Sequence, residues 1–334
     1  MTGKLLFRNT IQGKHDGKSC FVPFIYRLAS RITNTPLKDM VWDATYYTYS
    51  IESAYRLLNS SVICNAFDCT IECESCGCEV VWPGLYEKPY LAGLTDFTAT
   101  TRENFLTSGR IPIILEATKR LTISLGRECG IVGVVTGPCT LTCTLRRIAA
   151  GEGFENKNKN GTEIISMLGA LIISYVRALC ELKIDAVLFR EDVLGTEYME
   201  ELLLHKDAYR RVYGTLFNIV KAYNAFSLLT LKSLPVETIK KVASLLKVNG
   251  IILYGQNLNE SDLTLLRDIC HRCKISVGLP LPIENASQET LWNQLDLYES
   301  FIKKNLGSFF YTSNEEIPYD ISMEVLHDLL ERLQ

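Results

Sequence analysis

Short apolar runs recur along the chain, and most of them follow a segment with helical periodicity. The runs are continuous rather than alternating and rich in β-branched residues, a pattern typical of parallel strands that are buried on both faces. We expect eight strands, at Phe21–Tyr26, Ser61–Phe67, Gly130–Thr136, Asp185–Phe189, Ala225–Leu231, Gly250–Tyr254, Lys274–Leu279 and Gly307–Thr312.

Helical periodicity fills the segments between these runs. It is clearest at Ile111–Leu125, Thr162–Leu182, Val236–Val248 and Glu260–Cys273, and Asn259 or Ser261 is a candidate N-cap for the last of these helices. Strands that alternate with helices over this length predict an α/β fold, a single (β/α)8 TIM barrel. A doubly wound sheet is the alternative, but the chain has no GxGxxG after its first strand and no Walker A lysine.

We expect one domain over residues 1–334. The polar stretch Gly151–Gly161 (GEGFENKNKNG) is interpreted as a surface loop rather than a linker, because strands needed to close one sheet lie on both sides of it.

Composition and charge narrow the class of protein. Hydrophobic residues make up 47% of the chain and charged residues 22%, which provides a large core and excludes global disorder. The 35 basic and 38 acidic residues give a net charge of −3, so no broad positive field is available for nucleic acid.

The chain carries no visible signal for export. Its first residues lack the apolar core and cleavage site of a secretory signal, and the twelve cysteines are therefore expected to be reduced thiols in a cytoplasmic protein. The apolar stretch Met167–Val176 is short for a membrane span and is interpreted as a buried helix. We expect neither nucleic acid nor a membrane among the partners.

In a barrel of this kind the functional site lies at the C-terminal ends of the strands. The residues that follow the predicted strands are polar enough to receive an anionic or large polar ligand above an acid/base group. They are Arg27, Arg31, Asp68, Cys69, Glu72, Gly137, Pro138, Cys139, Thr140, Arg190, Glu191, Asp192, Lys232, Ser233, Gln256, Asn257, Pro280, Pro282, Ser313 and Asn314.

Three collinear blocks resemble the uroporphyrinogen decarboxylase superfamily, which also contains the cobamide-dependent methyltransferases. Residues 61–83 (SVICNAFDCTIECESCGCEVVWP) are similar to a D-x-T-x-E-A-E-A-x-G-C pattern of the methyltransferases. Gly109–Leu141 resembles a G-R-x-P-x-x-x-E-A helix followed by a strand ending in G-P-x-T-L, and VPFIYRLASR resembles V-P-x-W-F-M-R-Q-A-G-R. The resemblance implies the barrel fold more firmly than any one reaction.

The decarboxylase branch implies roles for three of the residues. By that resemblance Asp68 would contact pyrrole nitrogens, and Arg27 and Arg31 would hold substrate carboxylates. The chain departs from the decarboxylase at two places: FFYTSNEEIPYD has no histidine near the last strand, and Arg190-Glu191-Asp192 stands where the family has D-S-W-A-G.

The methyltransferase branch resembles the Asp68–Cys78 block better. By that resemblance the substrate would be a small methyl donor or acceptor, and the cofactor would be a corrinoid (methylcobalamin) carried by a partner protein that docks over the mouth. Several members bind zinc through H-x-C after the fifth strand and a cysteine after the eighth, but this chain has LLTLKSLP and YTSNEE there. The usual zinc site is therefore expected to be absent.

Two cysteine features allow other metal sites. His271 and Cys273 form an H-x-C, but they end the helix before the seventh strand, on the side of the barrel away from the mouth. Five thiols are close together in the sequence, and they are either packing residues or a metal or redox cluster. They are Cys64, Cys69, Cys73, Cys76 and Cys78.

Asp68 and Glu72 are the candidate acid/base pair. Two nearby carboxylates push their pKa values apart, which leaves one able to act as an acid near neutrality; alternatively, Glu72 completes a helix cap or pairs with Arg27.

The sequence thus predicts a corrinoid-dependent methyltransferase without the usual zinc, either as a monomer or as a homodimer. Its catalytic residues would be Asp68, Glu72 and Glu191, and its ligand-binding residues Arg27, Arg31, Gly137, Pro138, Arg190, Gln256, Asn257 and Asn314. The alternatives are a lyase that decarboxylates a tetrapyrrole polycarboxylate and a non-catalytic barrel that binds a corrinoid or tetrapyrrole.

Overall fold

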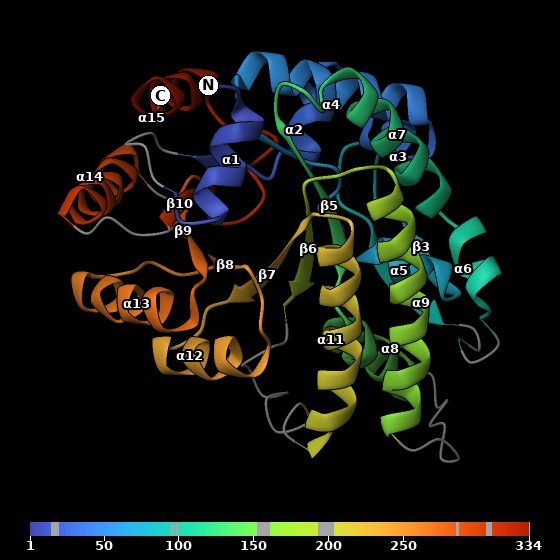
Figure 1. Ribbon diagram of the computed structural model, residues 1–334. Helices are drawn as coiled ribbons and strands as arrows, with labels where there is room; N and C mark the ends of the chain where they lie inside the picture. The colour runs from blue at the N-terminus through green and yellow to red at the C-terminus, as the bar shows by residue number, and fades with distance from the viewer. Residues whose placement is uncertain are drawn as a thin grey trace.

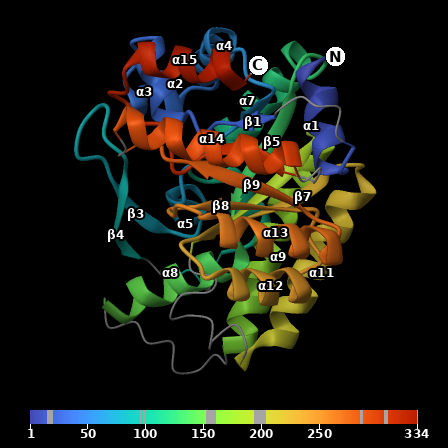
Figure 2. The same cartoon turned by 90° about the vertical axis from the view of Figure 1, so that its left-hand side faces the viewer.

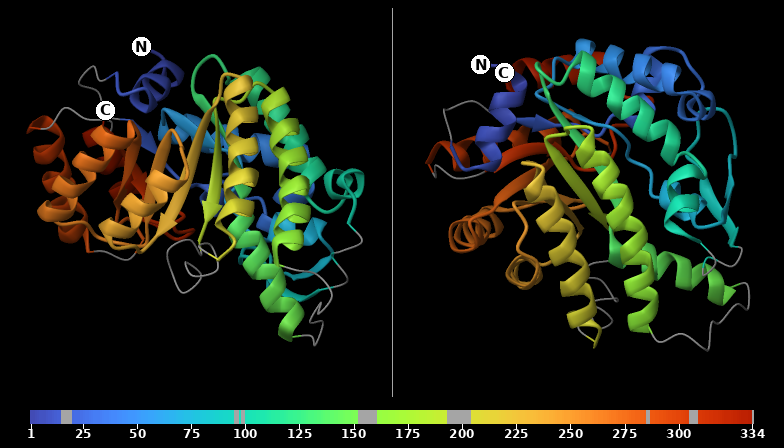
Figure 3. Two further views of the ribbon diagram at one scale, coloured as in Figure 1. Left: turned by 60° about the horizontal axis from the view of Figure 1, so that its bottom comes forward. Right: turned by 45° about the vertical axis from the view of Figure 1, so that its right-hand side comes forward.

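Eight parallel strands form a nearly closed barrel surrounded by helices, which confirms the predicted (β/α)8 TIM barrel (Figure 1). The computed structural model describes residues 1–14, 20–94, 97, 100–151, 161–192, 204–284, 287–304 and 309–333. The strands follow one another around the barrel in the order β1-β10-β9-β8-β7-β6-β5-β2, and β1 and β2 face each other across the seam. Figure 3 shows helices on both sides of the strands.

Every predicted strand is present at its expected place. The barrel strands are β1 (Phe21–Val22), β2 (Val62–Cys64), β5 (Gly130–Thr136), β6 (Ala186–Glu191), β7 (Phe226–Lys232), β8 (Gly250–Tyr254), β9 (Ser276–Leu281) and β10 (Phe309–Ser313). The largest difference is at the first strand, which was expected to reach Tyr26 but ends at Val22. Pro23 has no N–H to continue the ladder, and Tyr26 already begins helix α2.

The predicted helices are also present, with ends within a few residues of the expected ones. In chain order the helices are α1 (Gly3–Ile11), α2 (Tyr26–Ile32), α3 (Leu37–Trp42), α4 (Ala44–Leu58), α5 (Thr70–Ser75), α6 (Arg102–Thr107), α7 (Ile111–Ser124), α8 (Pro138–Gly151), α9 (Gly161–Glu181), α11 (Lys206–Ala222), α12 (Val236–Leu245), α13 (Glu260–Cys273), α14 (Gln288–Lys304) and α15 (Met323–Leu333). Asn259 caps α13, and with Asp262 it forms a reciprocal capping box.

Helix α9 contains the apolar stretch that was interpreted as a buried helix. It is long and apolar enough to cross a membrane by composition, but 56% of its most apolar window is buried inside the barrel protein. It packs against α8, α11 and β5 (Figure 1). This packing is that of an outer-layer helix of the barrel. The loop expected at Gly151–Gly161 lies, apart from its two end residues, outside the described residues.

A hairpin that the sequence patterning did not predict is inserted after α5. Strands β3 (Cys78–Val81) and β4 (Tyr90–Leu94) pair antiparallel and stand at the side of the barrel (Figure 2). The hairpin turn reaches the segment after β10: the Tyr86 and Tyr319 rings lie 5.4 Å apart, and Lys88 Nζ is 2.5 Å from a Glu316 oxygen. The hairpin therefore forms part of the wall around the C-terminal ends of the strands.

Helix α1, which was also not predicted, closes the opposite end of the barrel. Its Phe7 side chain is fully buried. Lys4 Nζ and Arg8 Nη1 lie 3.0 and 3.1 Å from the carboxylate of Asp185, just before β6, and Ser276 Oγ donates to carbonyl oxygens of the last turn. Both chain ends lie at this end of the molecule, away from α8 (Figures 1 and 3).

Candidate functional site

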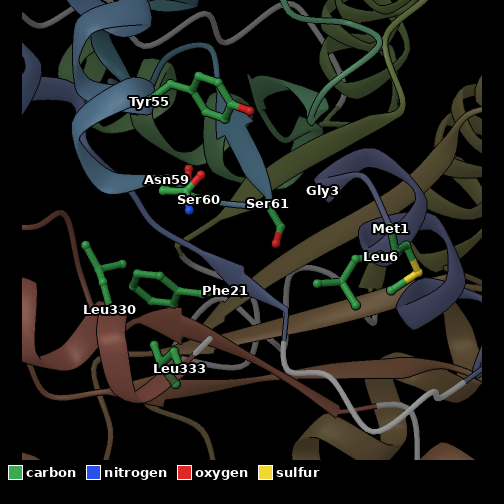
Figure 4. A pocket seen from close by; sticks show the side chains of 10 residues that line it. All are labelled: Met1, Gly3, Leu6, Phe21, Tyr55, Asn59, Ser60, Ser61, Leu330 and Leu333. Carbon is green, nitrogen blue, oxygen red and sulfur yellow. The ribbon is translucent and has the colours of Figure 1, made fainter.

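The mouth, defined here as the C-terminal ends of the barrel strands and the segments that follow them, holds most of the candidate residues. The opposite end contains a cavity of about 340 Å³ beside α1 and α15. Figure 4 shows that serine and asparagine side chains line one part of that cavity and leucine side chains another. None of the predicted site residues lines it.

Asp68 lies directly after β2 in a saturated hydrogen-bond network. Oδ2 accepts from Arg110 Nη1 at 2.6 Å and from Tyr26 Oη at 3.3 Å. Oδ1 accepts from the backbone N–H and the hydroxyl of Thr70 at 2.8 and 2.7 Å. Burial alone would raise the pKa of Asp68, but the Arg110 charge and the Thr70 hydrogen bonds outweigh it and hold the pKa below its ordinary value. Asp68 is therefore a bound anion rather than a free acceptor.

Arg110 was not among the predicted site residues, although it is the arginine of the G-R-x-P block. Its side chain is fully buried at the start of α7, where Nε donates to Glu74 at 2.9 Å and Nη2 to Thr70 at 2.6 Å. The guanidinium also lies 5.2 Å from the ring centre of Trp82. The spacing of the motif residues gave no sign of this contact, because α5 and α7 meet only in the folded barrel.

Glu72 is buried on α5 and bonded to the end of β5. Its two oxygens accept from the backbone N–H of Thr136 at 2.9 Å and from the Thr136 hydroxyl at 2.6 Å. Burial raises the pKa of Glu72 to about 7, and the nearby Asp68 charge adds to the rise. The pKa values of the two carboxyl groups therefore diverge as expected, with burial rather than charge repulsion as the main cause.

Neighbouring residues of β6 point to opposite sides of the barrel wall, as the two-residue period of a strand requires. The Arg190 guanidinium lies 4.1 Å from the ring centre of Phe67, which in turn stacks on Phe24 at 4.1 Å. These two aromatic residues follow β2 and β1, so their stack bridges the two strands that face each other across the seam. Arg190 Nη2 donates to Asp192 at 2.9 Å, and the Tyr254 hydroxyl donates to the other Asp192 oxygen.

Glu191 points outward, into the helix layer. Its oxygens accept from the backbone N–H groups of Cys139 and Thr140 at 3.2 and 2.8 Å, in the first turn of α8, and from the Tyr213 hydroxyl of α11. Burial raises the pKa of Glu191 to about 7. The structure thus assigns Glu191 to the N-terminus of α8, where a carboxylate satisfies otherwise unpaired N–H groups. A role in proton transfer at the mouth is not supported by this position.

Gly137 and Pro138 form the turn between β5 and α8. The Gly137 N–H donates to the Arg190 carbonyl at 2.8 Å, and Pro138 is the first residue of α8. A Cβ on Gly137 would lie 2.0 Å from the Glu191 carboxylate, so only glycine leaves room for that cap. Their predicted role as a backbone wall of the ligand site stays a prediction.

Arg27 and Arg31 both have partners within the protein. The Arg27 backbone N–H donates to Glu316 at 2.5 Å, and its Nε lies 3.6 Å from the same carboxylate. Arg31 Nη1 donates to the carbonyl oxygens of Tyr319 and Ile321 at 2.8 and 2.7 Å. The positions at which the family resemblance expects carboxylate-binding arginines are thus engaged with the segment that follows β10.

The remaining predicted residues lie after β8 and β10. The backbone N–H of Gln256 donates to Asn314 Oδ1 at 3.1 Å, which joins the two segments. Lys232 and Glu315 form an exposed ion pair at 3.7 Å beside them. Asn257, the residue after Gln256, is exposed.

The cysteines do not form a metal site among the residues that the structure describes. Cys64, Cys73, Cys76 and Cys78 are buried on β2, α5 and β3, which fits the packing interpretation. Cys69 is partly exposed, and burial raises its pKa, so its thiol is protonated near neutrality in the free protein. His271 and Cys273 end α13 on the side of the barrel away from the mouth, as expected. This donor set does not fit zinc.

Comparison with known proteins agrees with the three sequence blocks. A family described as Uroporphyrinogen decarboxylase (URO-D) matches residues 26–224, more than half of the chain. The chain belongs to this family. No curated protein sequence matches the chain.

Several solved structures have a similar fold. A methyltransferase from Methanosarcina mazei is similar, with a TM-score of 0.78 and 15% identity over 100% of this chain and 98% of the other. A B12-independent methionine synthase from Shewanella sp. W3-18-1 is similar with a TM-score of 0.55 and 11% identity over 86% of both chains. A putative vitamin-B12 independent methionine synthase from Listeria monocytogenes has a TM-score of 0.51 and 9% identity over 95% of this chain and 94% of the other. At these identities the similarity is one of fold.

Proposed function

We propose that this family member is a methyltransferase that moves a methyl group between a small molecule and a corrinoid carried by a partner protein over the mouth. The observation that carries the proposal is the pairing of the mouth residues. A decarboxylase of a tetrapyrrole polycarboxylate needs Asp68 as a free acceptor for pyrrole N–H groups and Arg27 and Arg31 as carboxylate binders. Here Asp68 accepts four hydrogen bonds within the protein, about the capacity of a carboxylate, and both arginines are engaged.

Methyl transfer does not require Asp68, Arg27 and Arg31 to be free for the substrate. The corrinoid would supply the metal centre that gives or takes the methyl group, and no residue of this chain has to ligate it because a partner protein would hold it. The described mouth residues fit that arrangement, because they offer hydrogen-bond donors and aromatic rings rather than a set of metal ligands. The similarity to the Methanosarcina methyltransferase along the whole chain supports the same reaction class.

The chain's own residues would bind the small molecule and manage its proton. A group that loses a methyl cation leaves as an anion unless it receives a proton. Glu72, whose pKa is about 7, is an acid at the mouth that can hold a proton near neutrality. Asp68, which stays ionised, positions Arg110 and Tyr26 beside it.

The proposal is tested by incubating the protein with methylcobalamin and acceptors, and with reduced cobalamin and methylated donors, while the cobalamin absorbance is recorded. We expect a spectral change that depends on the enzyme. Its rate should fall about 100-fold in Glu72→Gln, which is the effect of losing a general acid. Glu116→Gln, which alters an exposed carboxylate on α7, is the matched control and should keep full activity. Unchanged spectra with every partner would overturn the proposal, and CO2 release from uroporphyrinogen would favour the decarboxylase instead.

A further inference from the structure

Large side chains form an exposed stripe along the outward face of α4. Tyr46, Tyr49 and Leu57 are 53%, 59% and 54% exposed, and Trp42, just before the helix, is 44% exposed. With the partly exposed Ser53 between them they form the α4 stripe, since a 3.6-residue period puts the four helical residues on one face. The other faces of α4 pack against α2, α3 and α7 (Figures 1 and 2). A contiguous row of this kind is typical of a surface that binds another protein.

The two ends of the stripe carry opposite charges at nearly equal distances from its middle. Asp43, the N-cap of α4, lies six residues before Tyr49, and Arg56, in the last turn, lies seven residues after it. Both are exposed, and neither forms an ion pair with another described residue. Arg120 of α7, whose charge acts on Asp43, is itself paired with Glu116 at 2.8 Å. One acid and one base therefore remain available at opposite ends of the stripe.

An antiparallel pair of α4 helices would match these features to one another. With a two-fold axis crossing the middle of the helix near Tyr49, Trp42 of one copy faces Leu57 of the second copy. Asp43 then faces Arg56 of the second copy, and the two Tyr49 rings meet near the axis. Each contact occurs twice, because a two-fold interface joins the same patch of both copies. The α4 stripe is thus complementary to itself in its apolar and its charged positions.

The surface next to the stripe extends the contact area. Helix α4 has 15 residues and is about 22 Å long. A stable interface buries about 800 Å² on each partner, which is more than one helix face of this length supplies. Helix α7 lies beside α4, with Arg120 Nη1 donating to the Thr45 hydroxyl at 3.0 Å, and it adds Ile123, which is 76% exposed.

We propose that the α4 stripe is the contact surface of a homodimer, in which two copies of this chain pack their α4 helices antiparallel. The interface does not depend on the proposed function. Because the helices of a (β/α)8 barrel run antiparallel to its strands, this arrangement points the two mouths in opposite directions. Each mouth stays open to its own partner.

The first test is sedimentation equilibrium of the whole chain over a concentration series. We expect the mass to rise from that of one chain, 37.7 kDa, to twice that value as the concentration reaches about 100 µM. Tyr49→Lys puts two positive charges together near the axis and should weaken association at least about tenfold. Leu265→Lys, at a leucine of α13 that is 43% exposed, is the matched control and should leave association unchanged. A chain that stays monomeric, or equal association of the two variants, would overturn the proposal.

The charged ends test the direction of the helices. Arg56→Glu places a carboxylate opposite Asp43 at both ends and should weaken association about tenfold. Asp43→Asn retains an N-cap side chain, and adding it to Arg56→Glu should restore part of the association because the like charges are gone. Both residues are exposed, so the melting temperature should stay close to that of the parent chain. Absence of any restoration would contradict the antiparallel pairing.

Cross-linking tests the position of the axis. With copper–phenanthroline as oxidant, Tyr49→Cys should give a covalent dimer, because the two thiols meet near the axis. Leu57→Cys should not, since antiparallel helices hold it more than about 20 Å from its own copy, beyond the reach of a disulfide. The parent chain controls for the native cysteines. Equal cross-linking of both variants would indicate parallel helices and overturn the arrangement.

Discussion

Arg110 is the counter-ion of two carboxylates that have little contact with solvent. The side chains of Asp68 and Glu74 are 6% and 13% exposed, and Arg110 is bonded to both. Arg110→Met should reduce the free energy of unfolding by about 3–5 kcal/mol, because it leaves buried charge without compensation. Urea unfolding checks this value. The control Arg120→Met breaks an exposed pair on the same helix and should change stability by less than about 1 kcal/mol. Equal effects of the two substitutions would contradict the network.

Glu72 should make stability depend on pH in a definite direction. Its pKa is raised from 4.5 to about 7 in the folded state, so between these values the unfolded chain has released the proton while the folded protein retains it. The free energy of unfolding should therefore fall as the pH rises from 4.5 to 7, by up to about 1.4 kcal/mol per pH unit for this group.

Glu72→Gln keeps an acceptor for the Thr136 N–H but removes the titrating group. The slope of the unfolding free energy against pH should therefore decrease by the contribution of one proton. Glu191, whose pKa is also raised to about 7, contributes a second proton that the substitution leaves in place. Urea unfolding at several pH values measures the slope. An unchanged slope in the variant would mean that Glu72 is ionised throughout this range.

At the level of elements, the turn from β5 to α8 depends on a glycine for space rather than for backbone conformation. Gly137→Ala would push the Glu191 carboxylate from the first turn of α8, and we expect a loss of about 1–3 kcal/mol because buried N–H groups lose their acceptor. Gly214→Ala, in α11 where a Cβ meets no atom within 4 Å, should instead stabilise the protein by up to about 1 kcal/mol. Thermal unfolding separates the two; a neutral Gly137→Ala would contradict the cap.

The sequence predicted the elements of the barrel because strand burial and helix periodicity are local signals. The inserted hairpin β3–β4 and the closing helix α1 gave weaker signals, since both are short and obtain their stability from contacts far along the chain. For the site, the strand-end rule placed Asp68, Arg190 and Gln256 at the mouth. It could not show that Glu191 faces outward or that Arg110 pairs with Asp68, because both depend on which side of an element a side chain takes.

At the scale of the whole molecule, the end of the barrel opposite the mouth depends on α1. Phe7 is fully buried there and contacts the backbone near Gly130, so Phe7→Ala should reduce the free energy of unfolding by about 3–5 kcal/mol. Leu5→Ala, on the exposed side of the same helix, should change it by about 0.5 kcal/mol or less. Chemical denaturation measures both, and similar losses would show that α1 is not docked as described.

The position of α1 has a consequence for the order of events during synthesis. The helix leaves the ribosome before its partners: its hydrogen-bond partner Ser276 lies 266 residues beyond Thr10, and its ion-pair partner Asp185 is also distant. At about 5–20 residues per second, Ser276 is made roughly 13 to 53 s after Thr10. Until the segments around Gly130 and Ser276 have both been made, the apolar face of α1 is covered only in part. A nascent chain of this protein should therefore expose part of Gly3–Ile11 to chaperones until the barrel is nearly complete.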